Sequence, residues 1–174
     1  NEIAGIKSDG TLWSWGFNGD WGQLGHGNRT NYSSPTQVGT DTTWGNVYMS
    51  SEFCVGVKTN GTLWMWGLNS EGIRGPNGNQ SGWGAESSPV QIGTSTNWST
   101  EDGKFGHGTG GIMGAIKTDG TLWCWGKKTG GSLGQNNNTT YTSPRQVGTA
   151  TDWLVIGGRQ GINQKNVKAL KTDG

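Results

Sequence analysis

The stretch Gly5-Ile6-Lys7-Ser8-Asp9-Gly10-Thr11-Leu12-Trp13-Ser14-Trp15-Gly16 decides the fold, because most of it recurs twice more along the chain. The second copy runs from Gly56 to Gly67, the third from Ala115 to Gly126, and the opening half returns as Ala169 to Gly174. The turn glycines of successive copies stand roughly 50 to 60 residues apart. Such a period is typical of repeat architectures, and short strands at this spacing indicate the blades of a β-propeller.

An Asp-Gly or Asn-Gly pair stands between apolar flanks in each full copy. This dipeptide favours a two-residue type I′ turn, which needs positive φ at both central positions. We therefore expect antiparallel hairpins that turn at Asp9-Gly10, Asn60-Gly61 and Asp119-Gly120. A two-residue turn places Ile6 opposite Trp13, Lys7 opposite Leu12, Val57 opposite Trp64 and Ile116 opposite Trp123.

Alternation along a strand puts the two tryptophans of each copy on one face. One hairpin cannot bury such a face, whereas stacked repeats cover one another. A second phrase, Ser-Pro-x-Gln-(Val/Ile)-Gly-Thr-x-Thr-x-Trp, adds a further tryptophan to each unit. We expect a repeat core built on Trp13, Trp15, Trp44, Trp64, Trp66, Trp98, Trp123, Trp125 and Trp153. An exposed platform for sugars or bases is the alternative interpretation of the paired rings, which their strict recurrence disfavours.

The repeated phrase, followed by Asn18 and by Gly22-Gln23-Leu24-Gly25-His26-Gly27, resembles the repeat of the regulator-of-chromosome-condensation family. The resemblance covers essentially the whole chain and implies an all-β fold, a partial β-propeller that forms part of a seven-bladed ring. We expect one propeller segment over 1–174, with repeat units at approximately 4–55, 56–114 and 115–168 and the start of a further unit at 169–174.

Two features indicate that more blades exist. The chain lacks an initiator Met, and its fourth phrase stops before the tryptophan pair, so we expect a segment of a longer polypeptide or a processed product. Three full units cannot close a propeller, which typically has about 4–8 blades. Further blades, in the same chain or in other chains, are therefore expected to complete the ring.

Composition disfavours several function classes. The chain has 13 Lys and Arg against 12 Asp and Glu, and its formal charge is +1. This balance, with no basic cluster, predicts no nucleic-acid partner. No apolar run approaches the roughly 20 residues that a membrane span needs. The low-charge, Asn-, Thr- and Gly-rich character favours an extracellular location, on a virion or a cell surface.

The usual chemical signatures are missing from the sequence. His26 and His107 both stand in Gly-His-Gly, but at different places in their repeats and without Cys or His partners at ligand spacing, so we predict no metal site. No nucleophile, base and orienting acid can be matched, which predicts no catalytic residues and no cofactor. The segment Gly106 to Gly111 lacks the strand and helix context of a phosphate-binding loop and is interpreted as a flexible loop.

The cysteines and the Asn-x-Ser/Thr triplets can be explained without a disulfide and, for the most part, without glycans. Cys54 and Cys124 occupy different repeat positions, which favours two buried free thiols over a disulfide. Asn-x-Ser/Thr triplets, the acceptor pattern for N-linked glycans, begin at Asn28, Asn31, Asn60, Asn79, Asn97, Asn137 and Asn138. Turn chemistry explains Asn60, whose repeat equivalents are Asp9 and Asp119, and composition accounts for most of the others.

Departures from the repeat indicate where individual function lies, because loops carry the contacts of such proteins. Trp21 and Trp83 have no equivalents in the third unit. We predict partner contacts from Trp21, Trp83, Arg74 and His107, and from the loop 103–111. The predicted function is a non-enzymatic structural or binding module for a protein or a glycan. The alternatives are an exchange-factor-like regulator of a small GTPase, an enzyme-inhibitor propeller and, last, a hydrolase built on a propeller.

Overall fold

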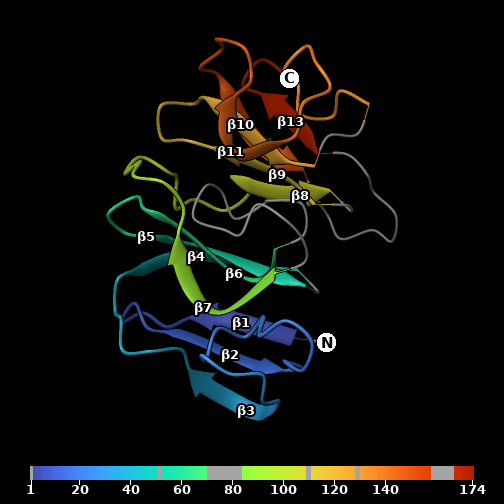
Figure 1. The fold of residues 1–174 in the computed structure, drawn as a ribbon. Helices are drawn as coiled ribbons and strands as arrows, with labels where there is room; N and C mark the ends of the chain where they lie inside the picture. The colour runs from blue at the N-terminus through green and yellow to red at the C-terminus, as the bar shows by residue number, and fades with distance from the viewer. Residues whose placement is uncertain (1, 51, 70–83, 109–110, 128–129, 158–166) are drawn as a thin grey trace. The chain divides into compact units, whose positions relative to one another are not determined.

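The computed structural model describes residues 2–50, 52–69, 84–108, 111–127, 130–157 and 167–174. These residues form thirteen β-strands and no helix, so the described part contains no helix that could cross a membrane. The chain divides into two compact units: 1–69 with 83–96, and 70–82 with 97–174. Both units consist of antiparallel sheets (Figure 1), as the all-β prediction required.

The first unit holds two sheets, which follow each other along the chain. The first sheet has the order β1 (Glu2–Ile6), β2 (Leu12–Gly16), β3 (Tyr32–Gln37). The second has the order β4 (Trp44–Met49), β5 (Phe53–Lys58), β6 (Leu63–Asn69), β7 (Gly84–Gln91). Strands β5 and β6 are the hairpin of the repeated phrase, flanked by one strand on each side.

The second unit repeats this plan. One sheet has the order β11 (Tyr141–Gln146), β10 (Leu122–Gly126), β9 (Ile112–Ile116), β8 (Phe105–Gly108), and β12 (Trp153–Gly157) pairs with β13 (Lys168–Lys171). Trp98 forms an isolated bridge with Lys117, as Trp44 at the start of β4 pairs with Lys58. The interpretation of Gly106 to Gly111 as a flexible loop is therefore wrong for its first half, because Gly106 to Gly108 belong to β8.

The three predicted hairpins are confirmed, but the predicted turn type is wrong. The backbone N–H of Lys7 donates to the Thr11 carbonyl at 3.0 Å, and that of Gly10 donates to the Lys7 carbonyl at 2.9 Å. The loop therefore has three residues, a type I turn followed by Gly10 in the left-handed region, with φ of 79°. Asp9 keeps a negative φ, since Asn136 is the one non-glycine with positive φ among the described residues. This is the three-residue hairpin loop with a glycine bulge.

The longer turn shifts the predicted pairing by one residue. Leu12 lies opposite Ile6, and Trp13 opposite Gly5. The other two hairpins have the same register, with the pairs Val57–Leu63, Gly56–Trp64, Ile116–Leu122 and Ala115–Trp123. The predicted partners of Trp13, Trp64, Trp123 and Leu12 are thus wrong. A shift of one residue also changes which side chains of the facing strand share a face with each tryptophan. The tryptophans share their face with a small residue instead of an aliphatic one.

The core of the first unit lies between its two sheets. Leu12 from β2 and Val38, directly after β3, pack with Trp44, Cys54 and Trp66 from the second sheet. In the second unit, buried residues of β9, β10 and β12 and of the segment between β10 and β11 form the corresponding cluster: Ile112, Ile116, Leu122, Cys124, Leu133 and Ile156. Trp66 and Trp125 are fully buried, Trp44 and Trp98 nearly so, and the other five recurrent tryptophans are half-buried.

Candidate functional site

A chain of hydrogen bonds ties each turn to the first tryptophan of the repeated phrase. The backbone N–H and the hydroxyl of Thr11 both donate to Asp9 Oδ1, at 3.0 and 2.6 Å, and Trp13 Nε1 donates to Thr11 Oγ1 at 2.8 Å. The same bonds join Asn60, Thr62 and Trp64, and Asp119, Thr121 and Trp123. The hydrogen bonds from Thr11 lower the pKa of Asp9. Recurring Asp, Thr and Trp side chains therefore stabilise the scaffold.

The lysine of each phrase lies against tryptophan rings. Lys58 Nζ lies 3.8 Å from the centroid of the Trp64 ring and 5.2 Å from that of Trp44. The equivalent distances from Lys117 are 4.1 Å to Trp123 and 4.9 Å to Trp98, and Lys7 lies 3.6 Å from Trp13. An ammonium over an indole face is attracted by the ring quadrupole. The lysines of the repeated phrase therefore belong to the scaffold as well.

The segment 22–27 connects the two sheets of the first unit. Trp66 Nε1 donates to the Gln23 carbonyl at 2.9 Å, and the Gly27 N–H donates to the Ser87 carbonyl at 2.7 Å. Gly25 has a φ of +85°, and a Cβ there would lie 2.8 Å from Trp66 Nε1. These contacts explain the Gly-Gln-Leu-Gly-His-Gly phrase, because the segment covers a buried tryptophan of the next sheet. In the sequence alone the phrase was visible only as part of the family resemblance.

His26 is part of this connection between the two sheets. The Ser14 hydroxyl donates to the Leu24 carbonyl at 2.7 Å, so its oxygen accepts the 3.0 Å hydrogen bond from His26 Nε2–H. The imidazole also packs on Tyr32, with ring centroids 4.3 Å apart. Burial lowers the pKa of His26. Among the described residues, no group of three or more His, Cys, Asp and Glu could hold a metal ion.

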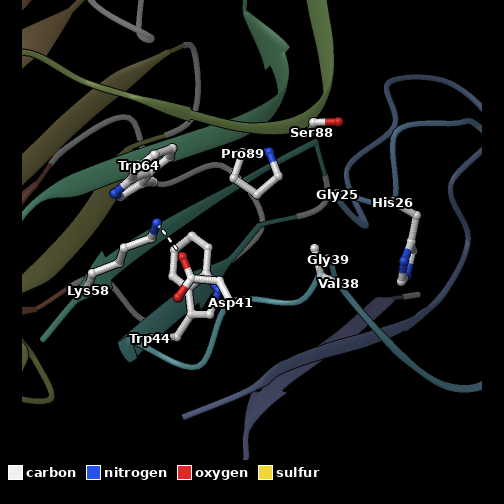
Figure 2. Close-up of a pocket in the computed structure, with 10 residues that line it drawn as sticks. All are labelled: Gly25, His26, Val38, Gly39, Asp41, Trp44, Lys58, Trp64, Ser88 and Pro89. Atoms are coloured by element: carbon white, nitrogen blue, oxygen red, sulfur yellow. Dashed lines mark ion pairs between the residues drawn. The ribbon is translucent and has the colours of Figure 1, made fainter.

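A pocket of about 290 Å³ lies in the first unit, beside this connection. Figure 2 shows its lining, which comes from the segments around positions 25 and 40 and from strands β4, β5, β6 and β7. The lining residues are Gly25, His26, Val38, Gly39, Asp41, Trp44, Lys58, Trp64, Ser88 and Pro89. The walls are two indole rings and a proline, and the charges belong to one ion pair.

That ion pair fixes the electrostatics of the pocket. Asp41 Oδ2 lies 2.5 Å from Lys58 Nζ, and Asp41 Oδ1 accepts from Thr43. Partial burial opposes ionisation of Asp41, but the hydrogen bonds from Lys58 and Thr43 outweigh it and lower the pKa of this carboxyl to about 2. The pair leaves the pocket neutral overall. Ser95 and Ala150 stand at the positions equivalent to Asp41, and in the third repeat Asp152, two residues later in the phrase, pairs with the equivalent lysine, Lys171, at 3.1 Å.

The predicted contact residues are not brought together. Trp21 is half-buried in the loop between β2 and β3, where its backbone N–H donates to Gln23 Oε1 at 3.3 Å. His107 is half-buried in β8, opposite Met113, and belongs to the other unit. Placing His107 in a loop was therefore wrong. Trp83 and Arg74 lie outside the described residues. Sequence reasoning missed the pocket, whose one signal was Asp41, a charged residue at a phrase position where the other repeats have Ser95 and Ala150.

Local chemistry accounts for the cysteines and for two of the Asn-x-Thr triplets. Cys54 and Cys124 are free and buried, and burial raises the pKa of Cys124 to about 12. Asn28 Oδ1 accepts from the Thr30 N–H at 2.9 Å, while its Nδ2 donates to the Tyr32 hydroxyl. Asn137, Thr139 and Tyr141 make the same bonds in the third repeat. The two triplets are turn structures of the repeat.

Comparison with known proteins gives the family. The pattern described as "Regulator of chromosome condensation (RCC1) repeat" matches residues 9–56 and 119–155. The chain is 29% identical over 160 residues to the "Ultraviolet-B receptor UVR8" of Arabidopsis thaliana, covering 88% of this chain and 33% of that protein. It is 36% identical over 69 residues to the "X-linked retinitis pigmentosa GTPase regulator homolog" of Caenorhabditis elegans, covering 38% of this chain and 5% of that protein.

Solved structures show the same architecture. Human WBSCR16 superposes with a TM-score of 0.64 at 25% identity, over 84% of this chain and 35% of that chain. Prp20p from Saccharomyces cerevisiae superposes with a TM-score of 0.69 at 16% identity, over 90% of this chain and 38% of that chain. The chain thus spans little more than a third of the length of these proteins. Its repeated phrase, its sheets and these matches show that the chain carries RCC1-type repeats and has the fold of a partial β-propeller.

Proposed function

We propose that the chain is a non-enzymatic propeller segment that binds a protein partner through the loops between its strands. One observation carries the proposal: residues that recur in every repeat are bound to one another, whereas repeat-specific residues lie in connecting loops. The recurring Asp–Thr–Trp bonds and Lys–Trp contacts belong to the first group. Trp21 and Asp41 belong to the second. A rigid scaffold with variable loops is how repeat folds carry binding.

The pocket beside Asp41 supports this role. Its volume of about 290 Å³ is at the lower end of small-molecule sites and suits one or two side chains of a partner. Its walls at Trp44, Trp64 and Pro89 are apolar, and the Asp41–Lys58 pair supplies a fixed polar edge. An apolar niche with a polar rim is a typical anchor point for a protein interface.

The names of the matched proteins favour a protein partner over a glycan. The Prp20p structure is described with its binding to Gsp1p and histones, and yeast RCC1 (Prp20) was also solved bound to Kap60. A regulator of a small GTPase is therefore the second candidate. The glycan partner and the virion or cell-surface location stay predictions from composition.

The test uses three variants of the whole protein for co-purification from its source cells. Trp21→Ala changes the loop between β2 and β3, Pro89→Ala changes the wall of the pocket in β7, and Thr59→Ala, at an exposed turn position, is the matched control. We expect a protein that the parent and Thr59→Ala retain and that Trp21→Ala or Pro89→Ala loses. Identical protein sets on all variants would contradict binding through this loop and this pocket.

A nucleotide-release assay separates the second candidate. The whole protein is mixed with Gsp1p that carries a fluorescent guanine nucleotide, and the release rate is followed. Acceleration of release would favour the regulator of a small GTPase. Hydrolytic turnover that disappears on changing a single polar residue would contradict the non-enzymatic assignment.

A further inference from the structure

The pocket of the first unit offers apolar surfaces to a ligand. Trp64 Nε1 donates to Thr62 Oγ1 at 2.9 Å, so the half-buried Trp64 ring adds an apolar face to the wall. Pro89 from β7 is also half-buried, whereas Trp44 is only 4% exposed. All the lining residues belong to the first unit, and strands of the second sheet together with the segments around positions 25 and 40 form the walls. An apolar ring of a ligand therefore has Trp64 and Pro89 to pack on.

Lys58 has more hydrogen-bond donors than the pocket uses. An ammonium carries three N–H donors, and among the described residues Asp41 is the polar partner of Lys58 Nζ, with Oδ2 at 2.5 Å. Figure 2 shows this ammonium at the pocket, directed toward Asp41. The Lys58 side chain is 14% exposed, so a ligand that fills the pocket separates the remaining N–H groups from water. Because a buried donor without an acceptor is destabilising, the ligand must bring an acceptor to Lys58.

The Asp41–Lys58 pair disfavours a charged anchor. A carboxylate of the ligand would lie near Asp41, and an ammonium or guanidinium would lie near Lys58; like charges repel more strongly in a partly buried site than in water. Donors of the ligand also find few acceptors, because Asp41 Oδ1 already accepts from the N–H and the hydroxyl of Thr43. The pocket therefore favours a neutral group that accepts hydrogen bonds and donates none.

A proline in an extended segment combines these properties. It has an apolar ring and no backbone N–H, and the carbonyls of a polyproline II helix have no internal partner. Grooves lined by aromatic rings bind such segments, because the preformed helix loses little entropy on binding. A side-chain amide would instead bring two N–H donors with its acceptor, and an aliphatic side chain would bring no acceptor of its own.

We propose that this pocket binds a proline in an extended segment of the partner protein. The ring packs on Trp64 and Pro89, and the carbonyl before it accepts a hydrogen bond from Lys58 Nζ, which Asp41 holds in place. The inference rests on the proposed function, because it names the chemistry of the partner for the same pocket. Lys58 thus has a second role beyond the scaffold, as the donor that selects the ligand.

The probe is a capped peptide of about ten prolines, which forms roughly three turns of polyproline II helix, titrated into the whole protein by calorimetry. A Gly-Ser peptide of the same length is the peptide control. Ser88→Tyr adds a ring at the exposed rim of the pocket in β7, where tyrosine suits a strand. Lys58→Met removes the donors and keeps a long side chain. Ser8→Tyr makes the same change as Ser88→Tyr at an exposed turn position outside the pocket and is the matched control.

We expect the parent and Ser8→Tyr to bind the proline peptide saturably and equally, and the Gly-Ser peptide not to bind. Ser88→Tyr should weaken binding by about tenfold or more, because its ring occupies the pocket. Lys58→Met should weaken binding by about tenfold, through the loss of one hydrogen bond from a charged donor. Thermal unfolding shows that each variant is folded, and Ser88→Tyr decides the test by itself if Lys58→Met is not.

Three results would overturn the inference: no saturable binding, equal binding of the Gly-Ser peptide, or binding of the proline peptide that Ser88→Tyr leaves unchanged. Binding that a folded Lys58→Met variant leaves unchanged would overturn the hydrogen bond from Lys58.

The co-purification experiment separates this inference from the proposed function. A protein lost by Trp21→Ala or Pro89→Ala, alongside a proline peptide that does not bind, would overturn the inference and leave the proposed function standing. A proline peptide that binds in the pocket, alongside identical protein sets on all variants, would support the preference for proline and contradict the proposed function.

Discussion

The sheets β1–β3 and β4–β7 contain nearly the same repeated phrase, yet they bury its tryptophans to different extents. Trp66 is fully buried, while Trp15 at the same place in the phrase is half-buried. Trp66 owes its cover to segment 22–27, from the preceding repeat, and to Trp44, whose ring lies 5.8 Å away. The phrase therefore encodes the hairpin, its turn and its hydrogen bonds, and neighbouring segments determine how far the tryptophans are buried.

Removing the equivalent tryptophans should show this difference most strongly. Trp66→Ala should lower the free energy of unfolding by about 3–5 kcal/mol, because it opens a cavity between two sheets. Trp15→Ala should cost less than about 2 kcal/mol, since its ring loses less buried area. Chemical denaturation of both variants measures the gap. Equal losses would contradict burial by the neighbouring repeat.

Two glycines test the same contrast through the backbone. Gly25 and Gly39 have φ of +85° and +62°, but only Gly25 faces a ring, whereas nothing lies within 4 Å of a Gly39 Cβ. Gly39→Ala should cost about 1 kcal/mol for the left-handed conformation. Gly25→Ala should cost about 2–4 kcal/mol, because strain and a steric clash combine. The midpoints of urea unfolding compare them, and similar midpoints would argue against the clash.

The Asp–Thr–Trp bonds should have an intermediate effect. Thr62→Val keeps the shape of the side chain but removes the hydroxyl that donates to Asn60 and accepts from Trp64. A loss of about 1–2 kcal/mol is expected, because the buried hydroxyl also leaves Trp64 Nε1 without its acceptor. Thr43→Val, at an exposed threonine with a similar bond to Asp41, is the control and should cost less. Thermal unfolding that ranks the two variants in the opposite order would count against this role.

The smallest effect concerns pH. Burial lowers the pKa of His26 in the folded state below the usual 6.5. The unfolded chain then binds the proton at a higher pH, so the stability from this group is present above pH 6.5 and is lost as the pH falls through the folded pKa. His26→Gln, which places here the residue found at Gln135, should flatten the dependence of the melting temperature on pH between about 7 and 5. An unchanged slope would exclude His26 as its source.

Sequence reasoning reached the fold because the repeat shows which residues share a position. It gave the all-β class, the hairpins and the family. It misplaced the register because Asp-Gly suits two turn types, and the choice depends on Thr11 binding Asp9, a bond within the turn that pattern alone does not show. It missed the pocket because Asp41, Pro89 and His26 come from three distant segments that meet only in the fold.

Segment 22–27 and Trp66 hold each other in place across the two sheets of the first unit. A double-mutant cycle of Gly25→Ala and Trp66→Ala, measured by denaturant unfolding, tests this mutual support. If the Trp66 ring fills the space of a Gly25 Cβ, removing the ring relieves the clash, and the double variant should be more stable than the sum of the single losses by about 1 kcal/mol or more. Strictly additive losses would show that the two sites are independent, and would contradict the claim.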